Sequence, residues 1–219
     1  MSDTRRRRVP RPVREQQIID AAIQVFAKRG YHAASVDEIA ELAGISKPMV
    51  YLYLDSKEGL FIACLRREAG RLVAAFQAAA GDAHSLELRL RAGLDAFFTF
   101  VTEHRASWVV LHRQASELSP AIAAEVTQAR RAVMEQVTDL VRVGIAESAA
   151  ATRPHDEDAD FVAHALVGAA DTLTDWMERH PDESPERITL RLMNMVWVGM
   201  RNVLDGEVWT PGEAGRTGE

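Results

Sequence analysis

Two short helix signals, separated by a glycine-containing turn, lie within residues 35–54 and constrain the fold of this chain more than any other feature. Ser35-Val-Asp-Glu38 has the Ser-x-x-Glu form of a capping box, so a helix is expected to begin directly after the serine. Ala43-Gly44-Ile45 interrupts that helix after about two turns, because glycine gives the backbone the freedom for a tight turn. The segment therefore predicts a short helix followed by a sharp turn.

A second short helix follows this turn. Ser46 is expected to cap it, and Pro48 falls in its first turn, where backbone N–H groups have no intrahelical acceptor and the fixed φ of proline favours a sharp start. Two short helices joined in this way match the pattern of a helix-turn-helix, whose second helix enters the major groove of DNA. The sequence therefore predicts a nucleic-acid-binding unit in this part of the chain.

The second short helix carries residue types that suit such a contact. Side chains of its N-terminal turn reach base edges, and a tyrosine near a duplex can donate its hydroxyl to a phosphate oxygen. A lysine at the start of the next helix adds a charge-assisted phosphate contact. The alternative is that one tyrosine is structural only, although Val50 and Leu54 are better candidates for the buried face. The candidate contacts, with the two capping serines, are Ser35, Ser46, Lys47, Pro48, Met49, Tyr51, Tyr53 and Lys57.

The rest of the chain has the pattern of helices. Apolar residues recur at three- to four-residue spacing from Arg14 until Gly30, which follows two basic residues as a helix stop does. Asp55-Ser-Lys-Glu58 offers an acidic or hydroxyl cap for a long helix that ends at Gly81. No strand alternation is visible, so the predicted fold is all-α with about nine helices. Those after Gly81 are expected at about residues 85–103, 105–115, 120–149, 157–180 and 185–205.

Charge is divided unevenly along the chain. The formal net charge is −6, yet the first 59 residues carry ten basic and eight acidic side chains. Six arginines lie in the first fourteen positions among prolines that disfavour helix, so a flexible cationic arm is predicted for residues 1–13. We expect it to contact phosphates or an adjacent minor groove; the alternative is a solubilising tail. The predicted contacts of the arm are Arg5, Arg6, Arg7, Arg8 and Arg11.

Several other classes of protein are disfavoured. Cys64 is the single cysteine, so an internal disulfide is excluded and a reducing compartment is favoured. No apolar run reaches the roughly 18 residues of a membrane helix, and no export signal is visible, so a cytoplasmic protein without a membrane partner is expected. Nucleophile elbows, His-Glu-x-x-His motifs and Gly-rich phosphate loops do not occur. The sequence predicts neither an enzyme nor a cofactor or metal site.

The segment Gly30–Phe61 closely resembles the DNA-binding domain of the tetracycline-repressor (TetR/AcrR) family of bacterial regulators. The resemblance covers about residues 14–61 and rests on Ser35, on the Ala-Gly-Ile-Ser turn, on Tyr51 and on Ser-Lys-Glu at 56–58. Two residues depart from the family pattern. Leu54 stands where phenylalanine is usual, and Pro48 stands where a small residue is common, which alters the base-facing chemistry.

For the remainder of the chain the resemblance implies a helical ligand-binding and dimerisation domain over residues 61–208. It would follow a DNA-binding domain over residues 14–60 and precede a flexible tail over residues 209–219. The last two helices of each subunit would form a four-helix interface, and they carry more apolar surface than one helix pair readily hides. The alternative is intramolecular core. The candidate interface residues are Phe161, Leu166, Leu173, Trp176, Leu192, Met195, Val196 and Leu204.

Aromatic and methionine side chains on the central helices indicate a ligand pocket, with polar residues close to them in a fold of this kind. Each of these residues fits a role as simple core equally well, and His164 also fits a buried histidine with satisfied hydrogen bonds. The candidate ligand contacts are Phe97, Phe98, Val101, Trp108, His112, Met134, Val137, His164 and Asp171.

These predictions describe a homodimeric regulator that binds a (pseudo)palindromic double-stranded DNA operator. It would act as a repressor, released from its operator by a small apolar or aromatic effector. The alternatives are a constitutive dimeric DNA-binding protein without an effector, a transcriptional activator, and a helical binding module or enzyme that shares only the N-terminal fold.

Overall fold

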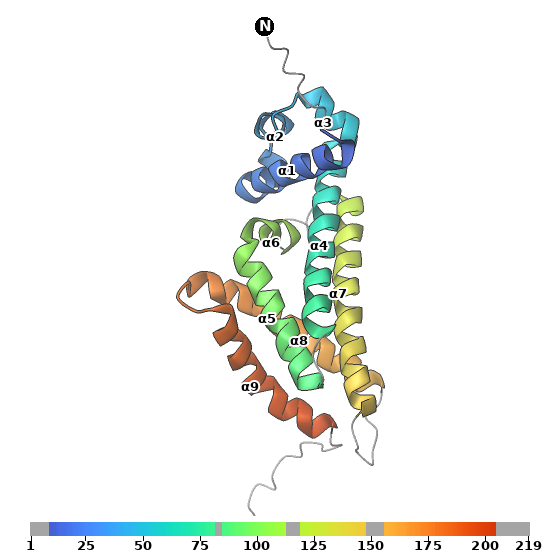
Figure 1. Ribbon diagram of the computed structural model, residues 1–219, viewed down its shortest axis with the longest axis vertical. Helices are drawn as coiled ribbons and strands as arrows, with labels where there is room; N and C mark the ends of the chain where they lie inside the picture. The colour runs from blue at the N-terminus through green and yellow to red at the C-terminus, as the bar shows by residue number, and fades with distance from the viewer. Residues whose placement is uncertain (1–8, 82–84, 113–118, 148–155, 205–219) are drawn as a thin grey trace, which may run out of the picture. The chain divides into compact units, whose positions relative to one another are not determined.

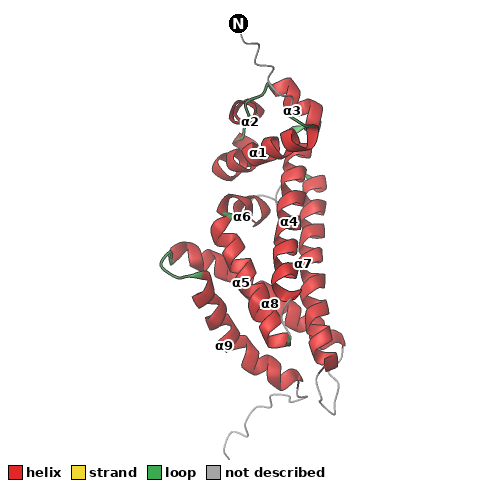
Figure 2. Ribbon diagram, viewed as in Figure 1, coloured by secondary structure: helices red, strands yellow, loops and turns green. Residues whose placement is uncertain are grey.

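The computed structural model describes residues 9–81, 85–112, 119–147 and 156–204 (Figure 1). These residues form nine α-helices, and no strand occurs among them (Figure 2). The predicted all-α class is confirmed, and the helices lie close to their expected positions. In chain order they are α1 (Arg11–Ala33), α2 (Val36–Leu42), α3 (Lys47–Leu54), α4 (Lys57–Gly81), α5 (Leu86–Glu103), α6 (Arg105–His112), α7 (Pro120–Glu147), α8 (Asp156–Arg179) and α9 (Pro185–Leu204).

The first helix begins earlier than the sequence suggested. Pro10 is the N-cap residue of α1, so residues 11–13, which were assigned to the basic arm, belong to the helix. Proline is tolerated there because the first turn of a helix needs no backbone donor. The predicted arm contacts Arg5, Arg6, Arg7 and Arg8 lie outside the described residues, as does the predicted tail 209–219.

Local capping shapes the short helices. Ser35 accepts a hydrogen bond from the backbone N–H of Asp37 at 3.1 Å, which satisfies one free donor of α2. Gly44 has a φ of 67°, the left-handed conformation that the turn requires. Ser46 is the N-cap residue of α3, but its side chain makes no capping hydrogen bond, so the expectation of a side-chain cap there is wrong. The Ser46 carbonyl instead accepts from Met49 N–H at 2.9 Å.

The chain divides into two compact units. The first comprises residues 1–74 and 100–132, and its core joins α1, α2, α3 and the start of α4. Val110 of α6 and Ile122 of α7 are buried in the same cluster. The predicted domain boundary at residue 60 does not separate these helices, because α4 runs through it without interruption and buries its first turns against α1.

The second unit comprises residues 75–99 and 133–219. Its core is built from one face each of α5, α7, α8 and α9, together with Phe76 at the end of α4. Leu90, Phe98, Val141 and Leu192 are among its buried members. Helical apolar periodicity brings these side chains to one face of each helix. No helix in the described part of the chain combines the length and apolar character that a membrane crossing requires.

Candidate nucleic-acid interface

The two faces of α3 have different roles. Val50 is 1% exposed and anchors the helix in the first core, against which Tyr53 and Leu54 are partly buried. The other face is open, since Met49 and Tyr51 are each 37% exposed and Leu52 is 66% exposed. A short helix that is fixed by one buried face can present the opposite face to a groove in DNA. The structural role considered for one tyrosine therefore fits Tyr53, whereas Tyr51 lies on the open face.

The N-terminal turn of α3 is tied to α2 by an ion pair. Lys47 Nζ lies 2.9 Å from Asp37 Oδ2, and both side chains are exposed. The hydrogen bond from Lys47 to Asp37, and then the charge of Asp37, raise the pKa of the lysine above its usual value. Lys47 is thus a charged group at the predicted base-reading position, but it has a carboxylate partner.

The start of α1 lies beside α3. The guanidinium carbon of Arg11 is 5.3 Å from the centre of the Tyr53 ring, a cation–π contact. One turn further along α1, Arg14 Nη1 donates to Gln17 Oε1 at 2.9 Å. Arg11 and Arg14 are three residues apart on the same helix, so they share one face. The remaining N–H donors of both guanidinium groups suit phosphate oxygens.

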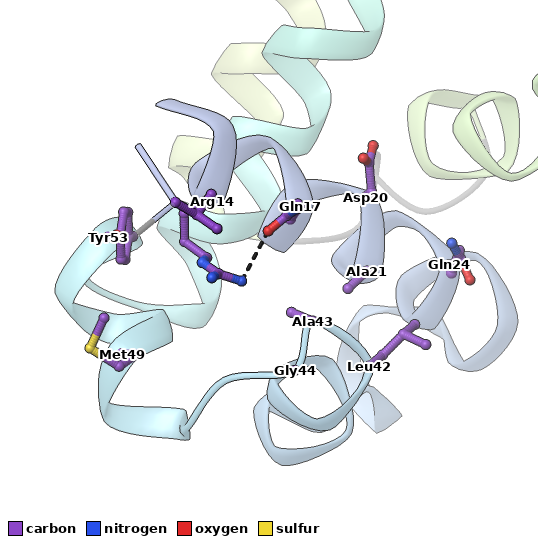
Figure 3. A pocket seen from close by; sticks show the side chains of 11 residues that line it. Arg14, Gln17, Asp20, Ala21, Gln24, Leu42, Ala43, Gly44, Met49 and Tyr53 are labelled. Atoms are coloured by element: carbon purple, nitrogen blue, oxygen red, sulfur yellow. Dashed lines mark hydrogen bonds between the residues drawn. The ribbon is translucent and has the colours of Figure 1, made fainter. Parts of the chain in front are cut away.

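A groove of about 740 Å³ lies between α1, the turn after α2, and α3 (Figure 3). Arg14 and Tyr53 line one part of it, and Leu42 and Gln24 line another (Figure 3). Its further lining residues are Val9, Gln17, Asp20, Ala21, Ala43, Gly44 and Met49. The groove is open and mixes charged, amide and apolar groups, with one arginine and one aspartate among them.

Lys57, predicted to contact a phosphate, already has partners in the protein. Its Nζ donates to the carbonyl oxygen of His32 at 3.1 Å and lies 4.9 Å from the centre of the Tyr31 ring. The lysine thereby binds a free carbonyl at the C-terminal end of α1. Partial burial lowers the pKa of Lys57. A phosphate contact by Lys57 stays a prediction. The lysine would make it with the N–H donors that do not bind the carbonyl oxygen of His32.

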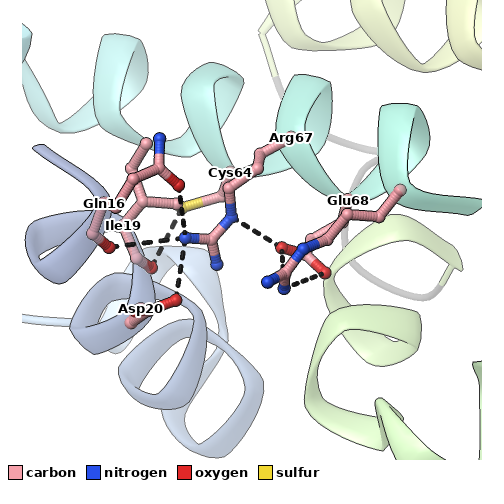
Figure 4. A network of polar contacts seen from close by, with 7 residues as sticks. Gln16, Ile19, Asp20, Cys64, Arg67 and Glu68 are labelled. Atoms are coloured by element: carbon pink, nitrogen blue, oxygen red, sulfur yellow. Dashed lines mark hydrogen bonds and ion pairs between the residues drawn. The ribbon is translucent and has the colours of Figure 1, made fainter. Parts of the chain in front are cut away.

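An ionic network around the buried carboxylate of Glu68 fixes α4 against α1 (Figure 4). Arg67 of α4 donates through Nη1 to Asp20 Oδ1 at 2.8 Å and to Gln16 Oε1 at 3.2 Å. Its Nε donates to Glu68 Oε1 at 2.7 Å, and the Glu68 side chain is fully buried. Arg71 contacts the same carboxylate at 3.3 Å. These contacts hold the first helix, and with it the helix-turn-helix, in a defined position on α4.

Three residues of this surface were not among the sequence candidates. Arg14 was taken as the start of the first helix, Asp37 as part of a capping box, and Leu52 was not considered. The three-residue spacing of Arg14 from Arg11, and of Leu52 from Met49, was a usable signal for both. Asp37 had no such signal, because its pairing with Lys47 depends on how α2 and α3 pack.

The nine predicted ligand contacts are divided between the two units. Val101, Trp108 and His112 belong to the first, where Trp108 and His112 stack with ring centres 4.8 Å apart. The others belong to the second, in which Phe98 and Val137 are buried and Phe97 and Met134 are partly buried. Phe97 and Phe98 meet edge to face, with their ring centres 5.2 Å apart. Asp171 is partly exposed.

His164 is an exposed residue of α8. Its side chain is 59% exposed, and Nδ1 lies 2.8 Å from the carbonyl oxygen of Asp160 on the same helix. Because of this exposure, the alternative of a buried histidine is wrong for the single chain, whereas the role of a ligand contact stays a prediction.

The predicted dimer residues differ in how far they are exposed within one chain. Leu166 and Leu192 are 3% and 2% exposed within one chain, so they fill the second core and have no area left for a partner. That part of the interface prediction is wrong, since apolar residues at helical spacing cover more than one face. Phe161 and Met195 are 75% and 69% exposed. Leu173, Trp176 and Val196 are partly buried, and the side chain of Leu204 lies outside the described residues.

Comparisons with known proteins agree with this geometry. Residues 18–64 match the family described as "Bacterial regulatory proteins, tetR family", and residues 86–199 match "Tetracyclin repressor-like, C-terminal domain". The chain is 38% identical over 134 residues to the HTH-type transcriptional activator FasR of Mycolicibacterium smegmatis. That match covers 61% of either protein, and a match to the regulator BetI of Rhizobium meliloti covers 53% of BetI.

Solved structures share the fold. A TetR-like transcriptional regulator from Rhodococcus sp. RHA1 is 38% identical, with a TM-score of 0.72, over 89% of this chain and 99% of the other. FadR from Bacillus subtilis, solved in complex with stearoyl-CoA, is 18% identical, with a TM-score of 0.73, over 83% and 96% of the two chains.

The two short helices, the open face of α3 and the matched relatives define a helix-turn-helix transcription regulator that binds DNA. The chain belongs to the tetracycline-repressor (TetR) family of bacterial regulators. FasR and BetI are both named as regulators of transcription.

Proposed function

We propose that this chain is a ligand-responsive regulator that binds its operator as a homodimer and represses transcription until a small apolar or aromatic effector releases it. The open face of α3 carries the proposal. Val50 fixes the helix in the core, so Pro48, Met49 and Tyr51 are presented in a constant orientation. Such a protein works in the cytoplasm of a bacterial cell, where its DNA lies.

Exposed apolar side chains on the last two helices support the proposed homodimer. Phe161 of α8 and Met195 of α9 are the most exposed large apolar residues among those that the structure describes in the second unit. Gly168 and Gly199 lie on the same two helices, and an added Cβ on either would meet no atom within 4 Å. Helices of a second chain can approach closely at such positions. A two-fold dimer would then place two α3 helices on two half-sites, which predicts a (pseudo)palindromic operator.

The continuity of α4 supports regulation by a ligand. This helix contributes residues 57–74 to the first unit and residues 75–81 to the second. Arg67 ties it to α1, so a tilt of α4 would carry the helix-turn-helix with it. Two α3 helices must lie roughly 34–36 Å apart, or a multiple of this, to engage both half-sites. An effector that binds better to a differently spaced state would release DNA by its differential affinity.

Equilibrium binding to DNA, with and without effectors, tests this function. The duplex would be selected from a random library by the full chain, and the effectors would include aromatic compounds and stearoyl-CoA, the ligand named for the FadR structure. Loss of specific binding on adding one of them is the expected result. Specific binding that no effector changes would indicate a constitutive DNA-binding protein, and the absence of specific binding would refute the operator itself.

Activation of transcription is the second candidate, because the relative FasR is named an activator. The two candidates predict opposite effects of deleting the gene on the neighbouring transcripts. The test is a reporter gene placed behind the selected operator, in cells with and without this protein. Deleting the protein would raise expression of the reporter if the protein is a repressor and lower it if the protein is an activator.

The spacing mechanism has its own test. Spin labels at Glu41, an exposed residue of α2, would report the distance between the two helix-turn-helix units of a dimer. We expect the distance distribution to shift when an effector abolishes DNA binding. If DNA is released while the distribution stays fixed, local disordering of residues 35–54 becomes the better explanation.

A further inference from the structure

Asp37 and Lys47 join the two helices of the helix-turn-helix, with Lys47 Nζ donating to Asp37 Oδ2 at 2.9 Å. We propose that Asp37 is a specificity-determining residue, which holds Lys47 ready for a base contact and keeps it from binding the phosphates of non-operator DNA. This inference rests on the proposed function, because it concerns how the same surface discriminates between DNA sequences.

The position of the pair supports this role. Lys47 is the first residue of α3, where side chains of a recognition helix reach base edges. Asp37 lies in the first turn of α2, so its carboxylate holds the ammonium group next to the N-terminal end of α3. The Lys47 and Asp37 side chains are 45% and 67% exposed, so DNA can reach both. The four-carbon stem of an unpaired lysine would sample many positions, and the ion pair limits them.

The energetics of the pair allow it to discriminate. An exposed ion pair contributes little to stability, so Lys47 can leave Asp37 at little cost. It does so when a base of the operator places an acceptor next to the position where Asp37 holds the ammonium group. A phosphate offers no such match, and it is repelled by the carboxylate beside the lysine. Binding to non-operator DNA is driven by cations that displace counterions from phosphates. Pairing one cation with Asp37 therefore removes about one contact from non-operator binding and leaves the base contact available.

The size of the effect follows from counterion release. One phosphate contact changes the slope of log affinity against log salt concentration by about 0.9, which corresponds to a factor on the order of five near 0.15 M salt. Asp37→Asn keeps the shape and an oxygen acceptor but removes the charge. We expect it to raise affinity for non-operator DNA about five-fold, to steepen the salt slope by about one unit, and to lower the ratio of operator to non-operator affinity.

The matched control is Glu41→Gln, because Glu41 is an exposed carboxylate at the other end of α2. It changes the net charge of the protein by the same amount without touching Lys47. The full chain and both variants would be titrated with the selected operator and with a scrambled duplex of the same composition. A second pair of variants, Lys47→Met and Asp37→Asn/Lys47→Met, shows whether Asp37 acts through the lysine.

The expected result is a five-fold effect of Asp37→Asn on the scrambled duplex, little effect of Glu41→Gln, and a much smaller effect of Asp37→Asn when Lys47 is already replaced. Equal effects of the two single variants would reduce the role of Asp37 to net charge and overturn the inference. A loss of operator affinity with unchanged scrambled binding would assign Asp37 to direct base reading and also overturn it. If the unaltered protein does not distinguish the two duplexes, the proposed function itself fails, which is a separate outcome.

Discussion

Arg67 of α4 binds Asp20 of α1 through a 2.8 Å contact between Nη1 and Oδ1, while its Nε faces the fully buried carboxylate of Glu68. A buried carboxylate without a cation partner carries a large desolvation cost, so the burial of Glu68 depends on the arginine staying where it is. The same side chain therefore neutralises a buried charge and fixes the first helix on α4.

The first prediction is that Arg67→Met lowers the free energy of unfolding by about 3 kcal/mol, because it leaves Glu68 buried with only the more distant Arg71 as a cation. The measurement is the midpoint of urea unfolding at one protein concentration, followed by helical circular dichroism. Arg66→Met is the control, since the Arg66 side chain is 68% exposed in its pair with Glu125 and should contribute below about 1 kcal/mol. Equal losses in the two variants would contradict the role of burial.

The second prediction concerns Cys64, which lies one turn before Arg67 and is buried. Its Sγ is 3.9 Å from the carbonyl oxygen of Ile19, and burial raises the pKa of the thiol well above its usual value. Because the thiolate is the reactive species, Cys64 should react with a disulfide reagent at pH 8 at least roughly 100-fold more slowly in the folded protein than in urea. Arg67→Met should increase the rate in the folded protein. Fast labelling of the unaltered protein without unfolding would show that this junction opens readily.

Much of the helix-turn-helix could be predicted because its signals are local. Ser35, Gly44 and Pro48 act on backbone groups within a few residues, and each is found where the sequence placed it. The hydroxyl of Ser46 shows the limit of that reasoning. A capping residue type was recognised correctly, but the backbone carbonyl makes the contact and the side chain does not.

Contacts between distant residues could not be predicted in this way. Lys57 lies 25 residues after His32, and only the packing of α4 on α1 brings its ammonium to that carbonyl. The interface prediction failed at Leu166 and Leu192 for a related reason. Apolar periodicity marks both Leu166 and Phe161 as members of an apolar face. It does not tell that Leu166 is buried within the same chain whereas Phe161 is left exposed.

The third prediction separates base reading from phosphate binding. Met49→Ala should weaken discrimination at one base pair of the operator by about 1–3 kcal/mol, because Met49 lies on the open face of α3. Lys57→Met should weaken binding to all sequences alike and lower the salt slope by about one unit. Competition against duplexes that each carry one substituted base pair distinguishes the two patterns. The same pattern from both variants would refute the assignment of α3 as the reading helix.

The fourth prediction concerns the basic arm. Because α1 begins at Arg11 and its first buried residue is Ile18, deleting residues 1–8 should leave the fold intact, whereas a deletion to residue 12 would remove helical residues. Losing Arg5, Arg6, Arg7 and Arg8 should lower the salt slope of DNA binding by up to about 3–4 units.

A variant with these four arginines replaced by glutamine is the control for chain length, and it should behave as the deletion does. Titrations over a range of salt concentrations give the slopes. If both variants bind DNA as the full chain does, the arm is the solubilising tail that the sequence left open.

The last prediction tests the dimer through Phe161. This side chain is 75% exposed on α8, so Phe161→Glu should leave the folded unit intact while placing an unpaired carboxylate in the proposed interface. A cost of at least about 3 kcal/mol is expected, which corresponds to a more than 100-fold higher dissociation constant of the dimer. The control is Leu88→Glu, because Leu88 is also an exposed apolar residue of the second unit, at 47%, but lies on α5. Sedimentation equilibrium should show dissociation for the first variant and not for the second, and operator affinity should fall in parallel, since one α3 helix engages only one half-site. Similar dissociation in both variants, or in neither, would place the interface away from α8.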